Sequence, residues 1–69
     1  MTKRQTALSR QRKDAGLSML ELARLAQTTR QHIHLLESGE GKPSLRVARR
    51  VAKALGQTVD VVFPPEVQS

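Results

Sequence analysis

Four side chains near the middle of the chain have the chemistry to read the bases of duplex DNA. Arg30 can donate two hydrogen bonds to O6 and N7 of guanine, and Gln31 can pair with N6 and N7 of adenine. His34 and Leu35 follow one helical turn later, and an apolar leucine side chain suits the methyl group of thymine. Each good pair of hydrogen bonds between a side chain and a base contributes about 1–3 kcal/mol of discrimination against the wrong base. That chemistry requires a helix that holds these side chains on an exposed face.

His32 and His34 raise a second chemistry, metal binding, but their spacing argues against it. Two histidines separated by one residue on a helix point their rings to different sides. No cysteine is present, and no carboxylate completes a set of ligands. The sequence therefore predicts no metal site and no cofactor. It also predicts no enzyme, because so small a chain has little room for a catalytic cleft and lacks a glycine-rich phosphate loop.

The charge balance favours an anionic partner. Among 69 residues, 12 are Lys or Arg and 6 are Asp or Glu, which gives a net charge of +6. All the lysines and arginines lie between Lys3 and Lys53, whereas residues 54–69 contain two acidic residues and no lysine or arginine. A basic domain of this kind most often binds nucleic acid. The cationic segment is therefore expected to contact the anion, and the acidic tail to do something else.

Composition also limits where the protein is expected to act. The absence of cysteine excludes disulfides. No apolar run approaches the roughly 18 residues of a membrane span, and the polar N-terminus does not resemble a signal peptide. We therefore expect a cytoplasmic, nucleoid-associated protein with no membrane partner.

Caps and glycines divide the cationic segment into four predicted helices. Ser18 and Glu21 have the spacing of a capping box, in which each side chain accepts from a backbone N–H of the other residue. Thr29 and Ser44 are predicted N-caps of two further helices, and glycines suited to C-terminal caps follow three of the helices. The predicted helices cover about residues 6–15, 18–26, 29–38 and 45–55.

The second and third of these helices predict a helix-turn-helix, because a three- or four-residue turn joins them. Small Ala23 permits a close approach between the two helices, and Ile33 and Leu36 form a narrow buried stripe on the second. The rest of that helix is free to enter a major groove, which is about 12 Å wide. The expected fold class is all-α, a compact four- to five-helix bundle.

The segment from Thr58 to Phe63 has a different pattern. Four of its six residues are strand formers, and Pro64 ends the run, so a short strand is predicted, although Thr58 could instead cap a short helix. A lone strand is not stable and needs a partner, for which the available sequence is its own copy in a second chain. This interpretation divides the chain into a DNA-binding domain, residues 1–57, and a dimerisation strand and tail, residues 58–69. The residues predicted to pair across the dimer are Val59, Val61, Val62 and Phe63.

Over about residues 6–63, an ordered series of short motifs resembles the Cro/lambda-repressor class of helix-turn-helix proteins, the XRE family. The motifs are Gly16-Leu17-Ser18, Glu21-Leu22-Ala23, Thr28-Thr29, Ile33, Leu36-Glu37-Ser38-Gly39, Lys42-Pro43-Ser44-Leu45 and Ala52-Lys53-Ala54-Leu55-Gly56. The resemblance implies a bundle of four or five helices that is usually dimeric on DNA. Two positions depart from the family pattern: Met19 replaces a frequent Gln, and Gln27 replaces the usual turn glycine, which predicts strain if that position needs a positive φ.

The resemblance assigns roles to three sets of residues. The base contacts that it implies are Arg30, Gln31, His34 and Leu35. The phosphate contacts that it implies are Ser18, Met19, Thr29, Lys42, Ser44 and Arg46. It also implies a structural ion pair between Arg12 and Glu37. Three further cations, Arg49, Arg50 and Lys53, could extend the phosphate contacts, bind an acidic partner or simply solvate a helix face.

The function expected from these features is that of a sequence-specific repressor. A homodimer would place helix 29–38 of each chain in successive major grooves of a palindromic operator. The alternative is an antitoxin that also binds a toxin protein, because a helix-turn-helix domain followed by a short strand resembles the HipB-type antitoxins. A third class, a protein-interaction module whose charge is incidental, remains open at this point.

Overall fold

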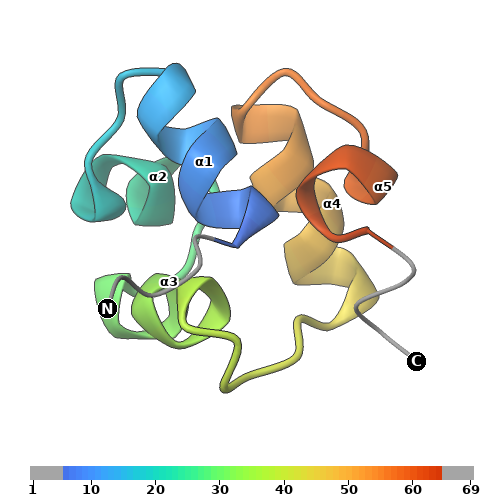
Figure 1. The fold of residues 1–69 in the computed structure, drawn as a ribbon. Helices are drawn as coiled ribbons and strands as arrows, with labels where there is room; N and C mark the ends of the chain where they lie inside the picture. Colours follow the sequence, from blue (N-terminus) through green and yellow to red (C-terminus); the bar gives the residue numbers. More distant parts are fainter. Residues whose placement is uncertain (1–5, 65–69) are drawn as a thin grey trace, which may run out of the picture.

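The computed structural model describes residues 6–64, which form five α-helices and no strand (Figure 1). This confirms the predicted all-α bundle. The helices are α1 (Ala7–Asp14), α2 (Met19–Leu25), α3 (Arg30–Glu37), α4 (Leu45–Ala54) and α5 (Val59–Val62). None of the helices in this part of the chain is long and apolar enough to cross a bilayer.

Each helix begins at a serine or threonine whose hydroxyl oxygen accepts a backbone N–H of the first turn. The predicted capping box is present at α2, where Glu21 N–H donates to Ser18 Oγ over 3.0 Å and Ser18 N–H donates to Glu21 Oε1 over 2.8 Å. The backbone hydrogen bond from Ser18 lowers the pKa of Glu21 below its ordinary value of 4.5, because it favours the charged carboxylate. The predicted helix starts therefore follow from local hydrogen bonding.

One hydrophobic core holds the helices together. Its largest fully buried side chains come one from each of the five helices. Those side chains are Leu8, Leu22, Ile33, Val51 and Val62. In this core α1 packs against α3 and α5, α2 packs against α3 and α4, and α4 packs against α5. The packing leaves α3 at one side of the molecule, at the bottom of Figure 1.

The prediction of a strand at residues 58–63 is wrong, because Val59–Val62 form α5. The Thr58 side chain caps this helix, and Phe63 N–H donates to the carbonyl of Val59 over 2.7 Å. Strand propensities differ by only about 1 kcal/mol, whereas burying a valine side chain contributes about 1.5–3 kcal/mol. Val62 is 1% exposed in the core of its own chain, so burial outweighs the β-branched composition. The predicted strand pairing between two chains therefore has no strand to form it.

Candidate nucleic-acid interface

The turn between α2 and α3 sets the angle at which the candidate recognition helix is presented. Ala23 and Ala26 are buried, which lets the two helices approach closely. After α2, Gln27 takes a φ of 58°, and Thr28 N–H donates to the carbonyl of Ala23 over 2.8 Å. Thr29 then caps α3 by accepting from His32 N–H over 3.0 Å. These bonds form a helix-turn-helix, as the sequence predicted.

Gln27, which stands where the family usually has a turn glycine, has a positive φ. The position does require the left-handed conformation, in which a residue with a Cβ is strained and glycine is not. The other left-handed positions in residues 6–64 are all occupied by glycine, namely Gly16, Gly39 and Gly56. Gln27 is therefore a strained residue inside the motif that carries the candidate site.

The third helix presents one apolar face to the core and a polar face to solvent. Ile33 and Leu36 are buried, whereas all four predicted base-contact residues are exposed. Each residue turns an α-helix by about 100°, so positions 30, 31, 34 and 35 fall within an arc of roughly 140°. Leu35 keeps 41% of its surface exposed although it is apolar. We call the arc formed by Arg30, Gln31, His34 and Leu35 the reading face.

His32 lies between the reading face and the core and has a contact that the sequence interpretation missed. Its Nδ1 is 2.9 Å from Thr28 Oγ1, and the ring is half-buried. Thr28 and His32 are four residues apart, a spacing that brings side chains together on a helical path and could have signalled the contact. The bond joins the turn to the first turn of α3. Among residues 6–64, no three His, Cys, Asp or Glu side chains are grouped so that they could hold a metal ion.

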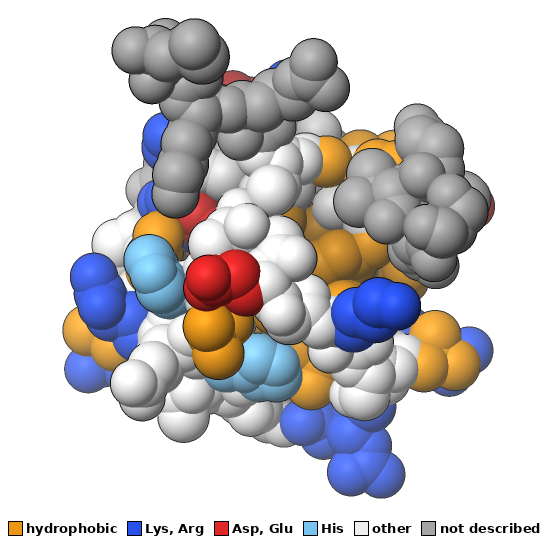
Figure 2. Space-filling model, turned by 60° about the horizontal axis from the view of Figure 1, so that its bottom comes forward, with side chains coloured by type: hydrophobic (Ala, Val, Ile, Leu, Met, Phe, Trp, Pro, Cys, Tyr) orange, Lys and Arg blue, Asp and Glu red, His pale blue; other side chains and the backbone are white. Residues whose placement is uncertain are grey.

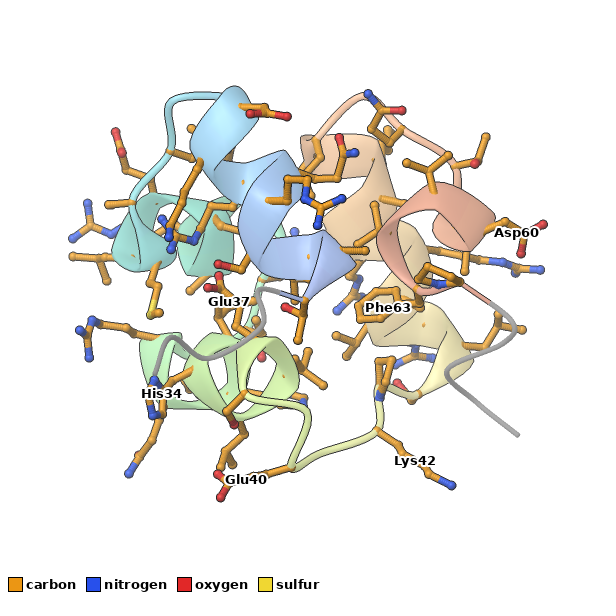
Figure 3. All side chains as sticks on the ribbon, viewed as in Figure 1. His34, Glu37, Glu40, Lys42, Asp60 and Phe63 are labelled. Atoms are coloured by element: carbon orange, nitrogen blue, oxygen red, sulfur yellow. The ribbon has the colours of Figure 1, made fainter. Side chains whose placement is uncertain are left out.

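Three of the candidate phosphate contacts follow α3 in the chain. Lys42 lies in the loop between α3 and α4, Ser44 caps α4 and Arg46 lies in its first turn, and all three are exposed. Figure 3 shows Lys42 and His34 on the same side of the molecule. Figure 2 shows this side from the front, with cations around its edge and histidine, apolar and acidic groups between them. This arrangement suits a duplex, whose bases lie inside a phosphate border.

Hydroxyl chemistry at the caps is compatible with phosphate binding. The side-chain oxygens of Thr29 and Ser44 accept from the N–H groups of His32 and Val47. A hydroxyl that accepts a bond can still donate its own proton. Ser18 has the same arrangement at α2. Met19 differs, because its half-buried thioether packs against the core and carries no hydrogen to donate.

The predicted ion pair between α1 and α3 is present in the structure. Arg12 Nη2 donates to Glu37 Oε1 over 3.1 Å, and Nε donates to Oε2. The guanidinium also donates to the carbonyl of Leu17 over 2.8 Å through Nη1. The side chains are only 11% and 5% exposed, respectively. The pair fixes the C-terminal end of α3 to α1.

Glu40 is a residue of this surface that the sequence interpretation did not select. It lies in the loop after α3, is exposed, and appears in Figure 3 on the same side as His34 and Lys42. Its Oε1 accepts from Ser38 Oγ over 3.1 Å. The sequence signal for it is an acidic residue between Gly39 and Gly41, two residues before the candidate phosphate contact Lys42.

Comparisons with known proteins agree with this geometry. The model of the helix-turn-helix family matches residues 8–62. Over 52 residues, which are 75% of either chain, the protein is 46% identical to an uncharacterized HTH-type transcriptional regulator of Methanothermobacter thermautotrophicus. No solved structure matches the chain. The family is one of regulators and not of enzymes, which confirms the expectation of no enzymatic activity. The chain therefore belongs to the helix-turn-helix family of DNA-binding transcriptional regulators.

Proposed function

We propose that this protein is a sequence-specific repressor that inserts α3 into the major groove of its operator. The observation that carries the proposal is the reading face. Arg30 and Gln31 bring hydrogen-bonding groups that match guanine and adenine edges, and they are exposed on a helix whose other side is fixed in the core. A rigid support of this kind lowers the entropy that would be lost on binding.

Most of the affinity is assigned to the DNA backbone. We assign the phosphate contacts to Thr29, Lys42, Ser44 and Arg46, which are all exposed. Each phosphate neutralised by a cation releases counterions, so the logarithm of the binding constant falls by about 0.9 per contact for each unit of log salt. A steep salt dependence is therefore expected on any duplex, and the reading face adds the preference for one sequence.

We further propose that the protein binds DNA as a homodimer, with a second copy as the occupant of an apolar groove. The groove measures about 760 Å³ and is formed by α1, α4, α5 and the loop before α4. Leu45, which lines the groove, is 61% exposed. Val61, which belongs to α5, is 41% exposed. Lys42 and Pro43 line the groove and also lie in the loop between α3 and α4, where Lys42 is a candidate phosphate contact. A copy docked there would bring a second reading face to the same side, where successive major grooves lie about 34 Å apart.

The test of DNA reading begins with selection of bound duplexes from a random pool by the wild-type protein. A palindromic consensus with half-sites one helical turn apart is expected. Arg30→Ala should then lose about 1–3 kcal/mol on the consensus and little on random DNA. Lys42→Ala should weaken both duplexes alike and make the salt dependence shallower by about one phosphate. Failure to enrich any sequence, or equal losses for both variants on both duplexes, would contradict the proposal.

The structure of residues 6–64 lacks the strand on which the antitoxin alternative was based. That alternative depended on a C-terminal strand at residues 58–63, and α5 occupies that segment. A toxin partner has no other support in the described residues. The repressor is therefore the function that we propose.

A further inference from the structure

Two hydrogen bonds attach Glu40 to the C-terminal end of α3, one through its backbone and one through its carboxylate. Glu40 N–H donates to the carbonyl of Leu35 over 3.1 Å, so the residue is attached to the end of the helix that carries the reading face. The Ser38 hydroxyl lies 3.1 Å from Glu40 Oε1 and 3.0 Å from the Leu35 carbonyl oxygen. A single hydroxyl proton can serve either acceptor. The carboxylate can therefore exchange its bond from Ser38 for another donor, and Ser38 keeps a partner.

Apart from the hydrogen bond from Ser38, the local structure gives no stabilising reason for an acid at this position. Glu37 is paired with Arg12, and Glu21 belongs to the capping box of α2. Among residues 6–64, no Lys or Arg forms an ion pair with Glu40. Glu40 follows the C-terminal end of α3, where the helix dipole favours a cation over an anion. Residues that oppose a local preference without compensation are concentrated at functional sites.

On the DNA-binding surface, the same carboxylate would repel phosphates. Lys42 is two residues away and is a candidate phosphate contact, so Glu40 would lie close to the phosphate border of the groove (Figure 3). A carboxylate can only accept hydrogen bonds. The N4 amino group of cytosine is the major-groove donor that Asp and Glu recognise. A cytosine within reach would therefore offset the repulsion, whereas guanine and thymine, which present only acceptors and a methyl group in the major groove, would not.

We propose that Glu40 is a specificity-determining residue of the DNA interface. Its charge weakens binding to duplexes of arbitrary sequence, and the operator relieves this penalty by presenting a cytosine amino group to the carboxylate. The proposal rests on the proposed function, since it assumes that α3 enters the major groove. It adds a discriminating group outside the reading face, one that acts by rejecting incorrect sequences as well as by accepting the correct one.

The test compares the wild-type protein with Glu40→Gln, which removes the charge and keeps the size of the side chain. Dissociation constants are measured by fluorescence anisotropy on the selected consensus duplex and on a scrambled duplex of equal composition. Glu40→Gln should bind the scrambled duplex more tightly. The ratio of scrambled to consensus dissociation constants should fall about fivefold or more, the lower end expected for one base contact. Selection from a random pool by this variant should lose a cytosine that the wild-type protein requires.

The matched control is Asp14→Asn, which makes the same charge change on an exposed residue. Asp14 ends α1, and that end of α1 lies on the opposite side of the molecule from α3 (Figure 1). The control should leave the ratio of dissociation constants unchanged. If Glu40→Gln shifts both duplexes by the same factor, or neither, Glu40 does not determine specificity, although α3 can still read DNA. If the wild-type protein itself prefers no duplex, the proposed function fails first, and the two failures are distinguishable.

Discussion

At the scale of single residues, the Arg12–Glu37 pair shows how a charged contact holds the reading face in place. Two bonds join the guanidinium to the carboxylate, and a third joins it to the backbone carbonyl of Leu17. The side chains are nearly buried, so each charge would lose its solvation without the other. The net stability of such a pair over an apolar replacement is small, but the loss of one partner is costly. The pair therefore determines the position of α3 more than it adds to the overall stability.

Glu37→Ala should lower the free energy of unfolding by about 3–5 kcal/mol, because it leaves the Arg12 guanidinium buried and unpaired. Urea denaturation followed by circular dichroism measures this loss. The double variant Arg12→Met with Glu37→Leu should recover most of it, because no charge is then left buried. Asp14→Ala, on an exposed residue, serves as the control and should change stability by less than about 0.5 kcal/mol. An unchanged denaturation midpoint for Glu37→Ala would show that the pair is not structural.

At the scale of the elements, the ends of the helices follow one pattern with one exception. After α1, α2, α3 and α4, a left-handed residue is followed by an N–H that donates back to the helix, to Arg12, Ala23, Leu35 and Ala52, respectively. This is the Schellman arrangement, which usually has glycine at the left-handed position. Gln27 fills that position after α2. The exception lies in the turn of the helix-turn-helix, where strain affects the angle between α2 and α3.

Gln27→Gly should raise the free energy of unfolding by up to about 1 kcal/mol. The relief of left-handed strain is roughly 1–2 kcal/mol, and the greater freedom of glycine in the unfolded chain offsets part of it. Thermal and urea denaturation give the change. Gln57→Gly is a suitable control, because Gln57 also follows the end of a helix but does not have a positive φ; it should be neutral or destabilising. A loss of stability in Gln27→Gly would mean that the glutamine side chain makes a compensating contact.

At the scale of the whole molecule, α5 is both part of the core and a neighbour of the proposed dimer interface. Val62 is buried and lines the apolar groove, whereas Val61, next to it in α5, is exposed. Removal of residues 58–69 would therefore destroy the core along with any interface. A substitution at the surface of α5 separates these two effects. An exposed apolar surface next to a hydrophobic groove is typical of an interaction site.

Val61→Asp should shift the protein from dimer to monomer in light scattering, because it places a charge in an apolar contact between copies. Thermal stability of the monomer should change little, since Val61 is exposed. Binding to a single half-site should persist while the full palindrome loses its added affinity. Leu25→Asp makes the same change on the exposed surface of α2 and should leave the dimer intact. A Val61→Asp protein that is still dimeric would place the interface elsewhere.

Much of the fold was predictable because its signals are local. The caps at Ser18, Thr29 and Ser44 and the glycines after the helices depend on hydrogen bonds between residues three to five apart, and a sequence displays such spacings directly. The reading face was predictable for a similar reason. Once helix 30–37 is placed, its periodicity decides that Ile33 and Leu36 turn inward and Arg30 and Gln31 outward.

The wrong strand and the unselected Glu40 both involve contacts that composition cannot reveal. The β-branched residues at 59–62 favour a strand by themselves, but the burial of Val62 against α1 and α4 makes them a helix. The loop after α3 places Glu40 beside Leu35 and on the same side of the molecule as His34. The sequence alone determined the first four helices, their caps and the residues that α3 exposes, because these depend on local geometry. Only the tertiary structure decided that residues 59–62 form a helix and which residues lie next to Glu40, because burial and proximity depend on the whole chain.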